Sequence, residues 1–431
     1  MNELFTMTRF SFIFLLLCLA IGAQAQNKLT AAQWQQDIDT LQQRLPLLHP
    51  NFFTNFTRSD FKEDLENIKA HLSGKSDTQI ALELQSVVAY GGDGQTRLDL
   101  TELLMQEKVI PFALSGWSDG LYVSATAKRF EQISGTKILT INKLSAEDAL
   151  KKMGRFVAQE NSHTNQRDAL SWFRFPVALQ MAGISKTDTL TLVVEKRDGK
   201  TATVQIYPLD PTKPANRAGM QPVMFQPLQP DLRWQPATGF FTQQWLPADS
   251  VLYVQYNHCL SQEMAMTTGD AEAAAKLPAF QTFADSIFAF LAQKPYAKVL
   301  VDLRFNPGGT PWDGVKLAQR FGKLPQENRP AQIFVATNAF TQGAAVEVAA
   351  CFATIAGATL IGEPSGTKPN HFDIVRQFRL PHSQVVVQYS SQYRPVQKGI
   401  SQVLIPKVLI PVNFEQYRKG LDPVLDFVRN H

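Results

Sequence analysis

Three short segments of the chain contain residue types that could perform nucleophilic or acid–base chemistry. The first is Asp-Leu-Arg-Phe-Asn-Pro-Gly-Gly, which runs from Asp302 to Gly309. Its last two residues, Gly308 and Gly309, allow backbone N–H groups to approach a ligand closely. A pair of such donors is what an oxyanion hole needs, although a tight turn before a helix would give the same pattern.

The other two segments could supply a nucleophile and a base. The second, Thr-Asn-Ala-Phe-Thr-Gln-Gly-Ala-Ala, runs from Thr337 to Ala345 and opens an Ala-rich helix. A nucleophile at such a strand-to-helix turn benefits from the helix N-terminus, which favours developing negative charge. The third, Gly-Glu-Pro-Ser-Gly-Thr-Lys-Pro-Asn, runs from Gly362 to Asn370. Its lysine, Lys368, could lose its proton in an apolar site and act as a base, whereas most lysines are simply solvated.

Each segment follows a predicted strand in a part of the chain where strands and helices alternate. Such alternation predicts a mostly parallel sheet that is covered on both faces. Ligand sites in sheets of this kind lie beyond the carboxyl ends of the strands, where these segments begin. Strands are predicted at 251–256, 299–304, 332–336 and 358–362, and helices at 312–321, at 344–352 and from Pro278 onward.

Two other regions precede this one. Apolar residues spaced by three and four predict three helices, at 31–48, after Thr57 and at about 78–90. From 105 to 207, predicted strands surround a polar helical stretch and end in a hairpin around Asp198-Gly199. The residues that follow are rich in Pro and Gln, which predicts a linker or long loop. The predicted units are a helical one at 26–104, a β-rich one at 105–207, the linker or loop at 208–248 and the alternating one at 249–431.

Together, the three segments resemble the tail-specific, or C-terminal-processing, serine peptidases in order and spacing. The matching motifs are Asp-Leu-Arg-x-Asn-x-Gly-Gly, Gly-Glu-Pro-[Ser/Thr]-Gly-x-Lys and the Leu-Pro-His-Ser run at 380–383. The run Gly-Asp-Gly-Gln-Thr at 92–96 looks like the family's Gly-Asp-Gly-His-Thr segment. The resemblance covers residues 30–430 and is strongest from 298 to 390.

The resemblance implies an α/β catalytic core of the crotonase/ClpP type in residues 249–431, with a serine nucleophile and a lysine base. It also implies that residues 105–207 form a degenerate PDZ-like region with a helical insertion. Carried over residue by residue, Lys368 occupies the position of the base, and Gly308 or Gly309 donates to the oxyanion. The implied ligand is a polypeptide or the C-terminus of a peptide.

Two positions depart from the family pattern. The serine position falls on Gly343 when counted back from the lysine, and on Gln342 when Phe340-Thr341 is aligned with the family's Phe-Ser. Neither residue has a hydroxyl or thiol group, and Gln95 replaces the family's histidine. Loss of the nucleophile of a serine peptidase removes about a millionfold of rate.

These departures leave several functions open. The first is a degenerate peptidase that binds chain ends or regulates a partner. In the second, Thr341 acts as a displaced nucleophile, although a hydroxyl one residue from the vacant position would point elsewhere. Ser365 is a weaker candidate for that role, because it lies in the lysine's own loop. The remaining two are a crotonase-like acyl-group enzyme, which would also use paired N–H donors, and a structural envelope protein.

The first residues predict export. Arg9, an apolar run from Phe10 to Ile21 and the sequence Ala23-Gln24-Ala25 are typical of a secretory signal peptide at residues 1–25. About a dozen apolar residues are too few to span a bilayer well. We therefore expect cleavage after Ala25 and a location in a periplasm or outside the cell.

Composition narrows the classes of ligand. The chain has 431 residues, with 42 Lys+Arg and 38 Asp+Glu, and a formal net charge of +4. A balance this small, without a run of basic residues, makes nucleic-acid binding a poor explanation. Cys259 and Cys351 remain after cleavage and lie in apolar stretches, which predicts two buried free thiols. No Cys/His cluster has zinc-ligand spacing, so neither a metal nor another cofactor is expected.

Overall fold

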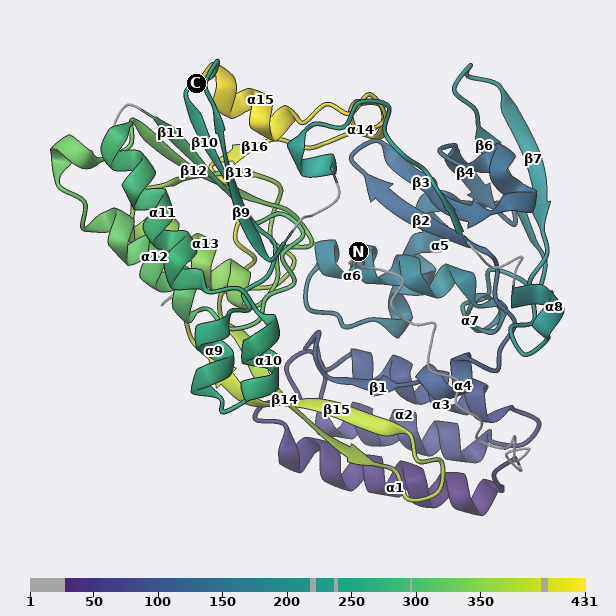
Figure 1. Cartoon of the computed structure of the whole chain (residues 1–431). Coiled ribbons are helices and arrows are strands. Elements are labelled where there is room, and N and C mark those ends of the chain that lie inside the picture. The colour runs from purple at the N-terminus through teal and green to yellow at the C-terminus, as the bar shows by residue number, and fades with distance from the viewer. Residues whose placement is uncertain (1–27, 218–221, 236–238, 295–296, 397–401) are drawn as a thin grey trace.

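The computed structural model describes residues 28–217, 222–235, 239–294, 297–396 and 402–431, which form three bodies of packed helices and strands (Figure 1). The predicted signal peptide at 1–25 and its cleavage site lie outside the described residues. None of the helices formed by the described residues has the length and apolar character that crossing a membrane requires.

Three helices form the N-terminal body, as predicted: α1 (Ala31–Leu48), α2 (Arg58–Ala70) and α3 (Asp77–Ala89). Each begins at a capping box, in which a Ser or Thr side chain accepts the backbone N–H three residues later and the side chain there returns the bond. The apolar face of α1 is buried, and each such side chain contributes about 1.5–3 kcal/mol. This face consists of Trp34, Ile38, Leu41 and Leu45.

A hairpin from the C-terminal half of the chain completes this body. It consists of β14 (His371–Arg379) and β15 (Val386–Arg394), and the short strand β1 (Arg97–Asp99) pairs with β15. Asp37 of α1 is buried, and its carboxylate accepts the backbone N–H groups of residues 382 and 383 in the hairpin turn. The hairpin belongs to the predicted unit 249–431, yet it packs against the N-terminal helices (Figure 1).

The middle body is β-rich, as predicted, and built on an antiparallel sheet. Residues predicted as a linker contribute a strand to it, β8 (Pro222–Met224), which pairs with the second strand of this sheet. The helices that lie between its strands are α5 (Ala146–Met153), α6 (Ser162–Ala169) and α7 (Pro176–Met181), with α4 (Thr101–Leu104) before and α8 (Pro214–Arg217) after them. The main strands, in spatial order, are β2 (Phe112–Trp117), β3 (Gly120–Ala127), β4 (Lys137–Ile141), β6 (Leu190–Glu195) and β7 (Thr201–Ile206), and β5 (Leu144–Ser145) pairs with β4.

The third body is the alternating α/β region. Its six-stranded sheet is parallel except at β9, which runs antiparallel to β10. β9 was not predicted from the sequence, because Thr242, Gln243 and Gln244 interrupt its apolar pattern. In spatial order the strands are β16 (Val408–Leu409), β13 (Thr359–Gly362), β12 (Gln332–Thr337), β11 (Lys298–Asp302), β10 (Val251–Tyr256) and β9 (Phe241–Leu246).

Helices cover both faces of this sheet, which confirms the predicted architecture. Successive side chains of a strand point to opposite faces, so a strand buried on both sides is apolar throughout. In β10, Val254 belongs to the core under one set of helices and Tyr253 to the core on the other face. The first set comprises α11 (Phe280–Gln293), α12 (Trp312–Gly322) and α13 (Ala344–Ile355), and the other face carries α15 (Pro423–Asn430). Shorter helices are α9 (Gln262–Thr267), α10 (Ala271–Lys276) and α14 (Phe414–Arg418).

Candidate functional site

The carboxyl ends of β11, β12 and β13 bring the three chemistry-bearing segments together. The backbone N–H of Gln342 donates to the carbonyl oxygen of Asn306 at 3.0 Å, which joins the second segment to the first. The backbone N–H of Gly343 donates to Oγ1 of Thr367 at 2.7 Å, which joins the second segment to the third. The loop that carries Lys368 is therefore tied directly to the start of α13.

A cavity of about 750 Å³ lies beside these loops. Its size is within the range of pockets that bind small molecules or short stretches of peptide. The middle body and both parts of the N-terminal body contribute to it as well as the loops. Its lining includes Asp93, Gln95, Glu160, Gly343 and Lys368.

Gly343 occupies a sharp strand-to-helix turn at the first residue before α13. Its φ of +49° and ψ of −121° lie where residues with a side chain are strained. A Cβ built on Gly343 would meet no atom within 4 Å. In α/β-hydrolases, a sharp strand-to-helix turn of this kind places the side chain of the nucleophile where a substrate can reach it. Gln342, the other predicted position, precedes this turn and also lines the cavity.

Lys368 lines the cavity with a half-buried side chain. Its backbone N–H donates to Oε1 of Glu160 at 3.3 Å. In the part of the chain that the structure describes, its ammonium group forms neither an ion pair nor a hydrogen bond. A cation in this situation is available to an anionic ligand.

The two glycines of the first segment differ in what their N–H groups do. Both have positive φ, +99° and +129°, and a Cβ on Gly308 would lie 3.0 Å from the carbonyl oxygen of Gln342. A Cβ on Gly309 would lie only 2.3 Å from the carbonyl oxygen of Cys259, so neither position has room for a side chain. The N–H of Gly308 already donates to Oδ1 of Asn306 at 2.9 Å. The N–H of Gly309 has no acceptor among the described residues, so it is the freer of the two predicted oxyanion donors.

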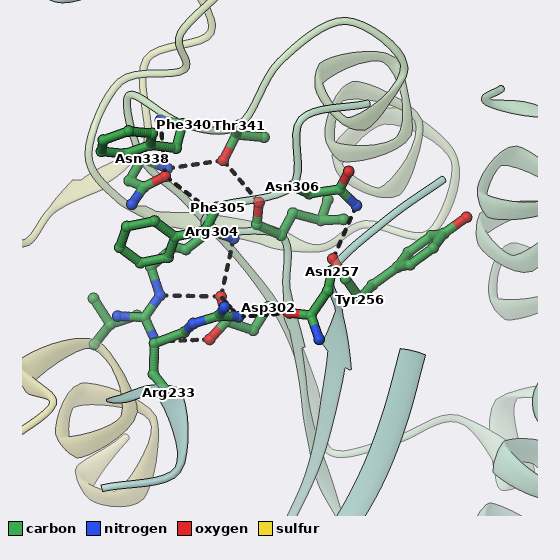
Figure 2. A network of polar contacts seen from close by, with 12 residues as sticks. Arg233, Tyr256, Asn257, Asp302, Arg304, Phe305, Asn306, Asn338, Phe340 and Thr341 are labelled. Atoms are coloured by element: carbon green, nitrogen blue, oxygen red, sulfur yellow. Dashed lines mark hydrogen bonds and ion pairs between the residues drawn. The ribbon is translucent and has the colours of Figure 1, made fainter. Parts of the chain in front are cut away.

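The two alternative hydroxyl groups are buried and already hydrogen-bonded. Oγ1 of Thr341 donates to the carbonyl oxygen of Leu303 at 2.9 Å and accepts the N–H of Asn338 at 3.0 Å (Figure 2). Oγ of Ser365 donates to the carbonyl oxygen of Thr367 at 2.8 Å and accepts a backbone N–H at 2.9 Å. Both side chains are fully buried, and neither lines the cavity. The structure therefore gives these hydroxyl groups a role in holding the loops.

A buried network of charges supports the first segment from behind (Figure 2). Arg304 donates to both carboxylate oxygens of Asp422, at 2.8 and 2.6 Å, and to Asp302 at 3.0 and 2.7 Å. Arg233 lies 4.0 Å from Asp302. Burial alone would raise the pKa of Asp302, but the two guanidinium groups hold it below its usual range. Two carboxylates thus face two cations, as buried charges require.

Asn338 joins the first two segments through its side chain. Its Oδ1 accepts the backbone N–H groups of Phe305 at 3.1 Å and Phe340 at 3.0 Å. Phe305 has a positive φ of +64°, and its ring stacks on that of Phe340 at a centroid distance of 5.2 Å. Asn306 anchors the same loop by donating to the carbonyl oxygen of Tyr256 at 2.9 Å (Figure 2). Asn338 was not among the predicted site residues, although an Asn directly after a strand is typical of a side-chain-stabilised turn.

Asp93 is a buried carboxylate at the edge of the cavity. It accepts hydrogen bonds from Nε2 of His49 at 3.2 Å, the hydroxyl of Thr96 at 2.5 Å and the backbone N–H of Gln95 at 3.0 Å. Nδ1 of His49 accepts the backbone N–H of Asn51, which leaves the proton of the ring on Nε2. Burial by itself would raise the pKa of Asp93, but the hydrogen bonds hold it below its usual range. Asp93 is therefore ionised at neutral pH.

Glu160 is the second carboxyl group of the cavity, and its environment has the opposite effect. Its two oxygens accept the backbone N–H groups of Gly94 and Lys368, each at 3.3 Å. Burial and the charge of Asp93 raise the pKa of Glu160 to about 7, although the two backbone N–H groups and the charge of Lys368 act in the opposite direction. Glu160 could not be predicted from the sequence, because it lies in a polar loop of the middle region with no motif around it.

The cysteines and possible metal ligands add no further chemistry here. Cys259 and Cys351 are both free, as predicted, but only Cys259 is fully buried. Burial raises the pKa of the Cys259 thiol to about 12, so it stays protonated. Among the described residues, no group of three or more His, Cys, Asp or Glu side chains could hold a metal ion.

Comparison with known proteins shows a shared fold. No family model matches the sequence, and no curated protein matches it significantly. The structure of mature CPAF complexed with lactacystin matches with a TM-score of 0.58 and 13% identity, over 93% of this chain and 98% of that one. A second structure of mature CPAF matches with a TM-score of 0.55 and 12% identity, over 92% and 96% of the two chains.

A photosystem II D1 C-terminal processing protease also matches over 93% of this chain and 97% of its own, with 14% identity and a TM-score of 0.39. Because the sequence identities are this low, the CPAF matches show a shared fold and nothing more. The two CPAF matches cover nearly the whole of both chains. The predicted resemblance to tail-specific peptidases is thereby confirmed at the level of the fold.

Proposed function

We propose that this protein is a pseudopeptidase of the tail-specific type, which binds polypeptide C-termini in its cavity and does not cleave them. The observation that supports this most directly is Gly343. The resemblance assigns a serine to Gly343 or Gln342, and only Gly343 occupies the strand-to-helix turn before α13. Gly343 lines the cavity, and a side chain at this position would meet no atom within 4 Å of its Cβ. We therefore place the vacant nucleophile position at Gly343.

The remaining groups of the site suit a bound carboxylate. The ammonium group of Lys368 has no partner among the described residues and is complementary to a chain terminus. The first turn of α13, which begins beside Gly343 in the cavity wall, adds positive potential on the same side. Donors that would stabilise a negatively charged oxygen during catalysis can equally hold the negative oxygens of a C-terminus. Loss of the serine would then leave binding intact.

An active peptidase that uses Thr341 with Lys368 as base is the alternative that these observations disfavour. The hydroxyl of Thr341 would have to break two hydrogen bonds and leave a buried position to reach the cavity. Ser365 faces the same obstacle. No observation favours a crotonase-like acyl-group enzyme, and a structural envelope protein has no need of an unpaired lysine in a cavity.

We also propose that the protein acts after export, with its signal peptide removed after Ala25. The apolar run and the Ala-x-Ala sequence support this. A periplasmic or extracellular location would give the cavity access to the C-termini of exported polypeptides.

The decisive experiment is hydrolysis of casein, an unfolded protein, by the purified protein and by two serine variants. We expect no hydrolysis by the natural sequence. Gly343→Ser should gain at least about 10³ in rate, within the roughly 10⁶ that a nucleophile supplies. Gln342→Ser is the matched control and should remain inactive, because its side chain precedes the turn.

Hydrolysis by the natural sequence that is lost in Lys368→Ala or Thr341→Ala would contradict the proposal. Binding provides the second test. Immobilised protein should retain members of a degenerate octapeptide library with free C-termini, and Lys368→Ala should retain at least about tenfold less. Equal retention by the two proteins would show that Lys368 does not bind the chain end.

A further inference from the structure

The middle body forms a wall of the cavity through one short segment, residues 159–168. The side chains of Asn161 and Thr164 both donate to the carbonyl oxygen of Gly366, two residues before the lysine. Nη1 of Arg167 donates to the carbonyl oxygen of Ala339 at 2.5 Å, in the loop that leads to Gly343. This segment therefore holds two of the three chemistry-bearing loops.

Glu160 is the residue of this segment that touches the ligand-binding groups. It links Gly94 of the N-terminal body to the backbone of Lys368, so its carboxyl group lies between these two parts of the cavity wall. Hydrogen bonds of 3.3 Å to two backbone donors are long for a carboxylate. They do not fully compensate the cost of an ionised group in this position.

Several other charged groups face the same cavity. Asp93 and Arg97 come from the N-terminal body, Arg167 and Asp168 from α6, Lys368 from the loop after β13 and His371 from β14. Asp168 is paired with Arg167 through two hydrogen bonds, at 2.6 and 2.8 Å, so it adds little net charge. Nδ1 of His371 bonds the carbonyl oxygen of Pro369. Glu160, Lys368 and Arg97, which donates to the neutral side chain of Gln388, are thus the acidic, Lys and Arg groups of the cavity that form no ion pair among the described residues.

A carboxylate ligand changes the balance of charge around Glu160. When it binds to Lys368, a third negative group joins Asp93 and Glu160 in one partly enclosed space. Like charges in such a space disfavour ionisation of the group that is hardest to ionise. A protonated Glu160 would also gain an O–H donor that can bond a ligand oxygen.

We propose that Glu160 takes up a proton when a peptide with a free C-terminal carboxylate binds beside Lys368, so that the site is specific for anionic chain ends and binds them more tightly in acid. This inference rests on the proposed function. It makes Glu160 a positioning and specificity-determining residue of the site. Because the pKa of Glu160 is about 7, roughly half of the molecules carry the proton at neutral pH before a ligand binds.

The test compares one peptide in two forms. An octapeptide that the protein retains from the library is synthesised with a free C-terminus and as the C-terminal amide, and fluorescence anisotropy gives Kd from pH 5.5 to 9. We expect the Kd of the free acid to rise by up to about tenfold per pH unit above pH 7, as one linked proton requires. The Kd of the amide should change little over the same range.

Three variants identify the titrating group. Glu160→Gln keeps the shape of the side chain and should remove the pH dependence, with the free acid bound at pH 9 as tightly as at pH 6. Asp168→Asn and His371→Gln change other titratable groups of the cavity and should keep it. A slope that persists in Glu160→Gln, or one that disappears in His371→Gln, would overturn the assignment to Glu160.

Calorimetry gives an independent measure of the proton. Binding of the free acid at pH 7.5, in two buffers of different ionisation enthalpy, should show uptake of a substantial fraction of one proton by the natural protein and none by Glu160→Gln. Binding of the acid with no pH dependence and no proton uptake would refute this inference and leave the proposed function standing. Absence of peptide binding at every pH would refute both.

Discussion

The loops at the carboxyl edge of the sheet have paired charges on one side and unpaired charges on the other. Behind the loops, Arg304 lies between Asp302 and Asp422 and donates hydrogen bonds to both carboxylates. In front of them, in the cavity, Lys368 has no partner among the described residues, and Glu160 has only two long bonds from backbone groups. Matched buried charges hold a structure in place, whereas unmatched charges in a cavity are available to a ligand. The charged groups behind the loops therefore stabilise the loops, whereas those in the cavity are available to bind a ligand.

The largest effect should come from breaking the matched side. Asp422→Ala leaves a single carboxylate, Asp302, to face the buried guanidinium groups of Arg304 and Arg233, and we expect a loss of about 3–5 kcal/mol in the free energy of unfolding, measured by urea denaturation. Asp426→Ala is the matched control. This variant removes an Asp partner of Arg429 on α15. The pair is partly exposed, so its loss should cost less than about 1 kcal/mol. Equal losses in the two variants would contradict the division between support and recognition.

A smaller effect should follow from Thr341→Val, which removes a hydroxyl group on the supporting side. The carbonyl of Leu303 and the N–H of Asn338 would both lose a buried partner, at a cost of about 2–4 kcal/mol. Thermal denaturation measures this loss. Thr354→Val is the control, since its exposed hydroxyl only bonds back within α13 and its removal should change stability by less than about 0.5 kcal/mol. A cost near zero for Thr341→Val would return its hydroxyl to the set of possible nucleophiles.

The smallest of these effects is the pH dependence that Glu160, in the cavity, gives to the free energy of unfolding. The pKa of Glu160 is about 7 in the folded protein and 4.5 is its usual value, so the unfolded chain releases this proton at lower pH. The contribution of Glu160 to stability is therefore fully present below pH 4.5 and is lost as pH rises to 7 and above. Relative to Glu160→Gln, the natural protein should lose about 1–3 kcal/mol of unfolding free energy between pH 4.5 and 8, a range that allows for solvent screening.

Denaturant titrations of both proteins across this range measure the difference. A constant difference at all pH values would mean that Glu160 is as well compensated as Asp302. The two sides of the loops would then not differ in the way described above.

Local patterns predicted the elements and the three segments. The capping box at Thr57 marks a helix start in the sequence itself, because its partner is only three residues away. The alternation of apolar strands and helices predicted a covered parallel sheet, and the carboxyl ends of its strands predicted where the segments would meet. Elements without a clear apolar period, such as β9, escaped the same method.

The site could be predicted only in part, because some of its residues come from distant parts of the chain. Glu160 and Lys368 are 208 positions apart, and Asp37 meets the hairpin turn 345 positions away. The choice between Gln342 and Gly343 for the vacant position also depended on backbone angles that no spacing in the sequence reveals.

By itself, the sequence determined the helices, the parallel sheet, the glycine-rich turns and the absence of a hydroxyl or thiol group at either candidate serine position. These follow from local rules, since periodicity, capping and residue type act over a few neighbouring residues. Only the tertiary structure decided that Thr341 and Ser365 are buried, that Gly308 gives its N–H to Asn306 and that Glu160 faces the lysine loop. Those outcomes depend on which surfaces pack together, and burial and hydrogen bonding between distant segments set them.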